Sequence, residues 1–132
     1  MEKILYDREG EAVAYVASDY EGTIYLWDGV PSAYLFEDAH VYGINGRHLG
    51  WFKGEVLYNN DGDRVGFTST TCPVPIAKPR PKGKQAPRDE IRPRWSAPPL
   101  PKLSFRLASQ SLTDFLSEGQ APKLQDQSES ET

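Results

Sequence analysis

An eleven-residue pattern occurs four times before Cys72, and each copy is centred on a glycine. In every copy a tyrosine stands four residues before the glycine and an apolar residue stands five before it. An Ala or Gly follows four residues after the glycine, and an aromatic residue follows five after it. The glycines are Gly10, Gly29, Gly46 and Gly62, and the tyrosines are Tyr6, Tyr25, Tyr42 and Tyr58. Such a repeat restricts the chain to similar units that pack on one another.

Each copy predicts a β-hairpin, because runs rich in β-branched and aromatic residues flank a tight turn that ends in glycine. Two turn types fit the sequence. In a two-residue type I′ turn, a pair such as Asn45-Gly46 occupies both positive-φ positions. In a type I turn closed by a G1 bulge, only the glycine is left-handed, and Asp7 or Asn59 caps the first position.

The distribution of apolar residues favours the bulged turn. In that register the apolar residue five before the glycine shares a side with the residues three and five after it. The other side of each hairpin then pairs the repeat tyrosine with the small residue four after the glycine. The residues expected on the shared side are Leu5, Val13, Tyr15, Ile24, Ser32, Tyr34, Val41, Leu49, Trp51, Leu57, Val65 and Phe67.

The turn glycines are 19, 17 and 16 residues apart, which leaves one hairpin and a short connection for each repeat. An isolated two-stranded hairpin is marginally stable in water, so the four hairpins must share a core. Closure about a pseudo-fourfold axis removes exposed strand edges more completely than an open stack does. We therefore expect an all-β domain over residues 1–71, in which four hairpins form a small rosette.

The repeat resembles the bacterial 4-fold beta flower family. The likeness rests on the motif Y-x-x-[DNE]-G-x-x-x-[AG]-[YWF] over residues 1 to about 70, with residues 45–52 (NGRHLGWF) as a clear copy. A basic Pro-rich tail after the repeats fits this family too. The resemblance implies a four-hairpin rosette and provides no activity, cofactor or catalytic residue. YD repeats and MORN-type hairpins are looser likenesses, because neither fits all four copies.

Charge and proline content change together near Cys72. Residues 1–71 carry a net charge of -7, whereas residues 72–102 carry +6 and hold nine of the 11 prolines. Proline lacks a backbone donor and favours extended polyproline II. We therefore expect residues 72–102 to be a basic Pro-rich linker, or stalk, without a fixed fold.

An apolar peptide follows over residues 103–119. Ser111 can cap a short helix whose third residue is Asp114, and Gly119 can end it. One face of this helix holds Leu112, Phe115 and Leu116. So short a helix is marginal by itself, so we expect it to dock on the rosette or on a partner. Residues 120–132 are polar and acidic, which predicts a disordered tail.

Cysteine content and hydropathy limit the class of protein. Cys72 is the only cysteine, which excludes an intrachain disulfide and a cysteine-based metal site. No basic-then-apolar start and no apolar run near ~18 residues occurs, so we expect neither a secretory signal nor a membrane span. Cytoplasmic localisation is the expectation, with export by a non-standard route as the alternative.

No catalytic residue, cofactor or metal site is expected. His48, beside Arg47, is the only basis for an enzyme, as a proton shuttle or anion contact. A histidine next to a turn is more often structural, as is His40, and no Ser-His-Asp, HExxH, P-loop or GxGxxG arrangement occurs. The turn carboxylates are typical turn formers rather than metal ligands: Asp7, Asp28, Asp38, Asp61 and Asp63.

These patterns predict a non-enzymatic binding or scaffolding module whose interaction is carried by residues 72–119. A protein partner is the preferred target. Pro98-x-x-Pro101 suggests recognition of an extended proline motif. Candidate contact residues are the repeat tyrosines Tyr6, Tyr25, Tyr42 and Tyr58, then Trp95, Leu112, Phe115 and Leu116.

The alternative is an exported or nucleic-acid-associated accessory protein with a passive rosette. A basic stalk attracts phosphate groups. The acidic charge of residues 1–71 opposes this attraction.

Overall fold

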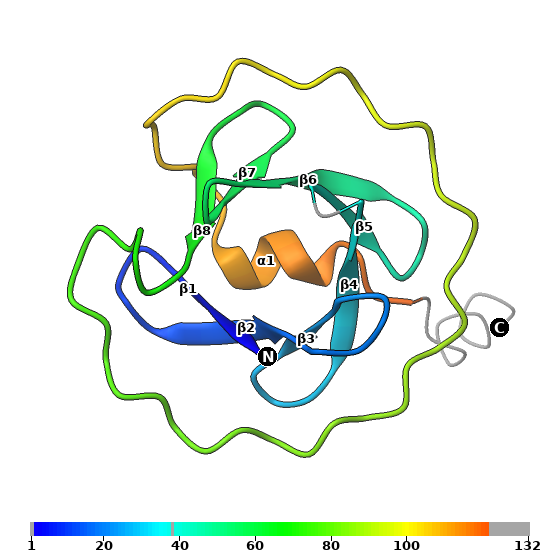
Figure 1. Cartoon of the computed structure of the whole chain (residues 1–132), viewed down its shortest axis with the longest axis horizontal. Helices are drawn as coiled ribbons and strands as arrows, with labels where there is room; N and C mark the ends of the chain where they lie inside the picture. The colour runs from blue at the N-terminus through cyan, green and yellow to red at the C-terminus, as the bar shows by residue number, and fades with distance from the viewer. Residues whose placement is uncertain (1, 38, 122–132) are drawn as a thin grey trace, which may run out of the picture.

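The protein is a closed ring of eight antiparallel strands in a computed structural model that describes residues 2–37 and 39–121 (Figure 1). Each strand pairs with the next one along the chain, and β8 returns to β1 through Phe67 and Tyr6. The predicted rosette of four hairpins is confirmed. The strands are β1 (Lys3–Tyr6), β2 (Ala12–Val16), β3 (Thr23–Leu26), β4 (Pro31–Phe36), β5 (His40–Gly43), β6 (His48–Lys53), β7 (Val56–Asn59) and β8 (Arg64–Phe67).

All four hairpins use the type I turn closed by a left-handed glycine. The backbone N–H of Gly10 donates to the Asp7 carbonyl at 3.0 Å, and Gly10 has a φ of 82°. The Asp7 carboxylate accepts from the N–H of Glu9, and the Asn59 side chain accepts in the same way from Asp61. The bulged alternative and its two capping residues are therefore confirmed.

A second bulge, three residues after each glycine, makes the predicted facing wrong in part. Leu5 pairs with Ala14 and Tyr6 pairs with Ala12, which leaves Val13 without a direct partner on β1. The corresponding residues of the other hairpins are Ser32, Leu49 and Val65. Because side chains alternate with period two, a second extra residue reverses the alternation beyond it.

The interior of the ring is therefore lined by the apolar residue before the turn and the small residue after it. Leu5 and Ala14 are fully buried there, and the other hairpins repeat the pair. The aromatic residues five after the glycine lie on the outer face instead, where Tyr15 stacks on Tyr25 at 5.6 Å. The expected packing of tyrosines over small residues is wrong for the same reason.

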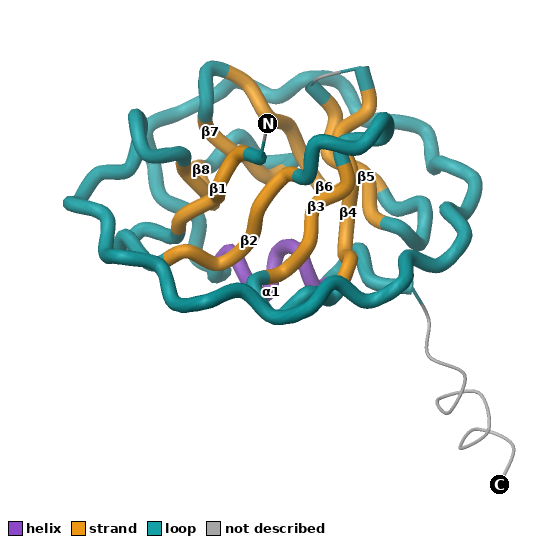
Figure 2. The backbone as a smooth tube through the Cα atoms, turned by 60° about the horizontal axis from the view of Figure 1, so that its bottom comes forward, coloured by secondary structure: helices purple, strands orange, loops and turns teal. Residues whose placement is uncertain are grey.

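Helix α1 (Leu112–Ser117) closes one mouth of the ring (Figures 1 and 2). The Ser111 hydroxyl accepts from the N–H of Asp114 at 3.0 Å, so the predicted cap is confirmed. The side chains of Leu112, Phe115 and Leu116 are at most 1% exposed and join the central apolar cluster. The expected docking thus occurs on the ring, and these three residues are not exposed for a partner.

Small residues on the strands make room for α1. A Cβ atom on Gly50 would overlap the Tyr58 carbonyl oxygen of the neighbouring strand and would lie 3.0 Å from Cζ of Phe115, and one on Gly66 would lie 2.9 Å from Cδ1 of Leu57 and 3.0 Å from Cδ1 of Leu112. The position four after the turn glycine is therefore small because the neighbouring strand and the helix both occupy the space around it.

Residues 73–107, which we call the belt, pass around the outside of the ring (Figure 1). They form no regular helix or strand, as the proline content predicts. The free stalk that we expected is not observed, because the belt is hydrogen-bonded to the ring. Just after the belt, the backbone N–H of Ala108 donates to the Arg64 carbonyl at 2.8 Å, and the chain then enters α1. Most of the predicted acidic tail, residues 122–132, lies outside the described residues.

Candidate functional site

The belt meets the ring at the four hairpin turns through backbone atoms. At each turn a belt N–H donates to the carbonyl oxygen of the turn glycine. Because these bonds use the main chain alone, they require no particular side chain. The pairs are Ala77 to Gly10 (2.9 Å), Ala86 to Gly29 (2.9 Å), Trp95 to Gly46 (2.8 Å) and Ser104 to Gly62 (3.0 Å).

The four donors are nine residues apart, so the belt advances nine residues for each hairpin. Nine residues in polyproline II span about 28 Å at ~3.1 Å per residue. Proline suits such a path because it fixes an extended backbone and removes N–H groups that would otherwise need partners. Each of the four hairpins of the ring is therefore matched by a step of nine residues in the belt.

Close approach of the belt gives the turn glycines a second reason to be glycine. A Cβ atom on Gly46 would overlap the carbonyl oxygen of Pro93, two residues before the Trp95 donor. The same overlap occurs at the other turns with belt residues that are again nine apart: Pro75, Lys84 and Lys102. The sequence predicted the turn role of these glycines and missed this one.

Basic belt side chains also contact the acidic ring. Arg88 pairs with Glu21 at 3.3 Å and donates to the Thr23 hydroxyl at 2.9 Å. Arg106 pairs with Asp63 at 2.9 Å. Each of these partly exposed ion pairs contributes little to stability. The opposite net charges of the belt and the ring together favour their association.

The repeat tyrosines lie beneath the belt. They are 4 to 8% exposed, so an aromatic platform open to a ligand is not formed. The Tyr42 hydroxyl donates to the Trp95 carbonyl at 2.9 Å. The residues concerned are Tyr6, Tyr25, Tyr42 and Tyr58.

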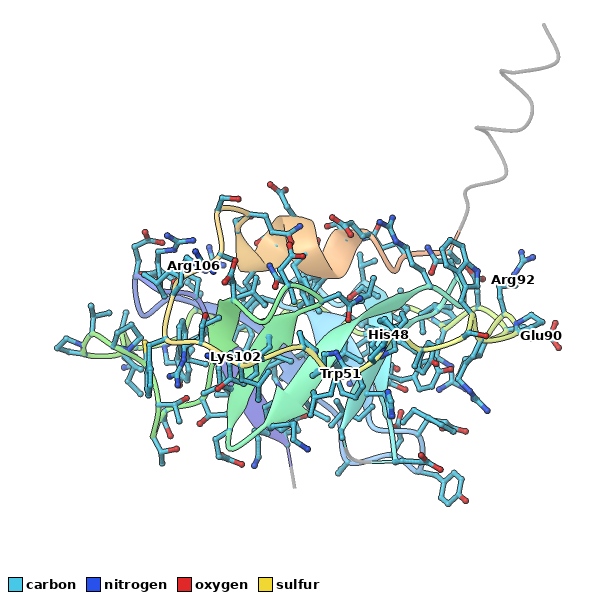
Figure 3. All side chains as sticks on the ribbon, turned by 90° about the horizontal axis from the view of Figure 1, so that it is seen from above. His48, Trp51, Glu90, Arg92, Lys102 and Arg106 are labelled. Atoms are coloured by element: carbon cyan, nitrogen blue, oxygen red, sulfur yellow. The ribbon has the colours of Figure 1, made fainter. Side chains whose placement is uncertain are left out.

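The belt carries several of the exposed apolar side chains, whereas Tyr20 and Val30 are exposed on the ring. Trp95 is 60% exposed, Leu100 is 48% exposed and Phe105 is 87% exposed. Basic side chains lie among them, and Arg92 projects at the rim of the molecule beside Glu90 (Figure 3). The part of the outer face of the belt around Trp95 is the candidate interaction surface, and Trp95 is the residue of it that the sequence predicted.

The two histidines form a contact on the outer face of the third hairpin. Nδ1 of His40 lies 3.1 Å from Nε2 of His48, and the ring of Trp51 lies 4.5 Å from that of His40. His48 is 6% exposed, and its Nδ1 has no hydrogen-bond partner within the described residues. Figure 3 places His48 and Trp51 on the same side of the ring.

Burial lowers the pKa of His48 to about 4, with the neighbouring His40 as the second cause and the Asn60 side chain as a smaller opposing effect. At neutral pH His48 is therefore uncharged. A buried, uncharged imidazole holds a structural hydrogen bond and is a poor proton donor to a substrate.

The low pKa of His48 predicts a loss of stability in acid. An unfolded histidine binds a proton near pH 6.5 and the folded one near pH 4, so the free energy of unfolding falls as the pH is lowered between these values. The full effect is about 3 kcal/mol. Urea unfolding from pH 7 to pH 4 should show a steeper loss for the parent chain than for His48→Gln; parallel curves would contradict the assignment.

A cleft of about 370 Å³ lies between the first two hairpins, the belt and α1. Asp7 and Asp28 line it, and both accept backbone N–H groups of their own turns, as predicted for turn formers. Within the described residues, no three His, Cys, Asp or Glu side chains gather as a metal cluster. In the same part of the chain, no helix has the length and apolar character needed to cross a bilayer.

These features define a class of protein: a closed ring of four glycine-turn hairpins, sealed by its own C-terminal helix and encircled by its own chain. Residues 3–116 match the profile of the 4-fold beta flower protein, and the chain belongs to that family. The matched range includes the belt and reaches Leu116. Comparison with curated proteins and with solved structures gave no match.

Proposed function

We propose that this chain is a non-enzymatic protein-binding module, located in the cytoplasm, whose partner contacts the outer face of the belt around Trp95. The ring and α1 supply the rigid support. The belt supplies the contact residues.

The observation that carries this proposal is the way Trp95 is held. Its N–H donates to Gly46 and its carbonyl accepts from Tyr42, so both backbone groups are fixed. Its indole is nevertheless 60% exposed. A large aromatic side chain on an immobilised backbone is typical of an interface anchor, because little conformational entropy remains to be lost on binding.

The neighbours of Trp95 indicate the chemistry of the partner. Arg92 is exposed three residues before it, and Leu100 is exposed five residues after it. The belt as a whole carries a net charge of +7. These features favour a protein surface with an apolar pocket for the indole and acidic groups at its rim.

Two parts of the sequence-based hypothesis are left out of this proposal. The apolar peptide of α1 is buried in the ring and is not exposed to a partner. Pro98 and Pro101 are half-buried, whereas Pro99 and Leu100 between them are exposed. A domain that recognises both prolines of a P-x-x-P motif would need the two half-buried residues, so that mode of recognition is not part of the proposal.

The test compares the proteins retained by the full chain with those retained by Trp95→Ala. Phe105→Ala is the matched control, because Phe105 is an exposed aromatic residue of the same belt. A partner that depends on Trp95 should bind Trp95→Ala at least about 30-fold more weakly than the parent chain, as expected for an interface anchor worth ~2 kcal/mol. Calorimetry with the purified partner measures this ratio.

The control decides between outcomes. Retention of one partner by the parent and Phe105→Ala, with loss by Trp95→Ala, supports the proposal. Equal binding by all three chains contradicts it. Retention of nucleic acid, with affinity that falls steeply as salt is raised and no dependence on Trp95, would favour the nucleic-acid alternative instead.

A further inference from the structure

We propose that His40 and His48 form a binding site for one monovalent soft metal ion of the Cu(I) and Ag(I) class. Nδ1 of His40 and Nε2 of His48 face each other at 3.1 Å across paired strands β5 and β6. A linear two-coordinate ion needs nitrogens about 4 Å apart, twice a metal–imidazole bond of ~2.0 Å. His40 is half-buried at the start of its strand, so a small shift of its ring opens this distance.

The protons of the pair are compatible with this coordination. Two neutral imidazoles carry one proton each, and one of these protons lies between the facing nitrogens. On binding, the ring that carries the shared proton changes tautomer: this proton leaves its facing nitrogen, and one proton is taken up on its outer nitrogen through solvent, while the other ring keeps its proton on its outer nitrogen. Both facing lone pairs then become ligands, and no net proton is released. On His48 that outer nitrogen is the buried Nδ1, which has no hydrogen-bond partner among the described residues.

The surroundings favour a monovalent ion. The ring of Trp51 lies 4.5 Å from that of His40 and 5.0 Å from that of His48, and aromatic rings attract cations without adding charge. Arg94 lies 3.9 Å over Phe36, so a positive charge is already close to this aromatic layer. A divalent ion would require further ligands, and among the described residues no third His, Cys, Asp or Glu joins the pair.

The test titrates Ag(I), as the air-stable probe, into the full chain carrying Cys72→Ser. This background is needed because the Cys72 thiol also binds soft metals. We expect one ion per chain, quenched tryptophan fluorescence, and NMR shifts at Nδ1 of His40 and Nε2 of His48. Loss of a ligand in His40→Gln or His48→Gln should weaken binding by at least about 100-fold, since loss of groups that only orient ligands already costs 10- to 100-fold.

Tyr34→Phe is the matched control, because Tyr34 stacks on Tyr42 in the same aromatic layer and offers no imidazole. It should bind Ag(I) as the parent does. His40→Gln keeps the test valid if the buried His48→Gln variant fails to fold. Parent-like binding by His40→Gln, unshifted imidazole nitrogens at saturating Ag(I), or tighter binding of Zn(II) than of Ag(I) would each overturn the proposal.

Discussion

Replacing Phe115 by alanine is expected to lower the free energy of unfolding by about 3 to 5 kcal/mol, the usual cost of removing a buried phenylalanine. Phe115 is 1% exposed in the central cluster, and its ring lies against Gly50. The ring of strands cannot contract to fill the space left by the phenyl group, because the closed sheet has a fixed diameter. Urea unfolding followed by tryptophan fluorescence measures the loss.

Thr113→Ala is the control for this variant, because Thr113 is an exposed residue of the same helix. Its effect should remain within about 0.5 kcal/mol. If both variants unfold at the same urea concentration, α1 does not support the ring in solution.

Replacing Gly46 by valine is expected to cost about 2 to 6 kcal/mol, from two sources that add. A β-branched residue at a φ of 92° is strained by about 1 to 3 kcal/mol. Its side chain would also overlap the Pro93 carbonyl, and overpacking of this kind costs about 1 to 3 kcal/mol more. Amide hydrogen exchange should show the second effect directly, as faster exchange of the Trp95 N–H.

Gly54→Val separates the two sources. Gly54 also has a positive φ, of 57°, but nothing lies within 4 Å of a Cβ atom added there. It should therefore show the backbone strain alone and leave exchange at Trp95 unchanged. Equal destabilisation by the two variants would mean that the belt does not press on the Gly46 turn.

The repeat and its turns could be predicted from the sequence because glycine and the residues around it carry strong local signals. The Asp7 cap, the left-handed Gly10 and the Ser111 cap all involve contacts within a few residues. Which side chains face the interior of the ring could be predicted only in part, because the second bulge is made by ordinary residues such as Val13 and Leu49. Nothing in their side chains marks an extra residue.

The belt could not be predicted for a different reason. The belt is attached through backbone N–H groups at Ala77, Ala86, Trp95 and Ser104. No recurring side chain therefore marks the nine-residue spacing in the sequence. The histidine pair depends on the register across β5 and β6, in which Tyr42 faces His48 and His40 faces Trp51. Composition correctly indicated an extended segment and could not indicate what it lies against.

Backbone-only attachment at four points has a consequence for how such a chain can change. Between consecutive anchors, those belt side chains that make no contact with the ring have no role in the fold. Each nine-residue window is held between two anchors, so much of its conformational entropy has been lost before any ligand arrives. Substitutions at these positions should therefore alter the outer surface of the belt without disturbing the core.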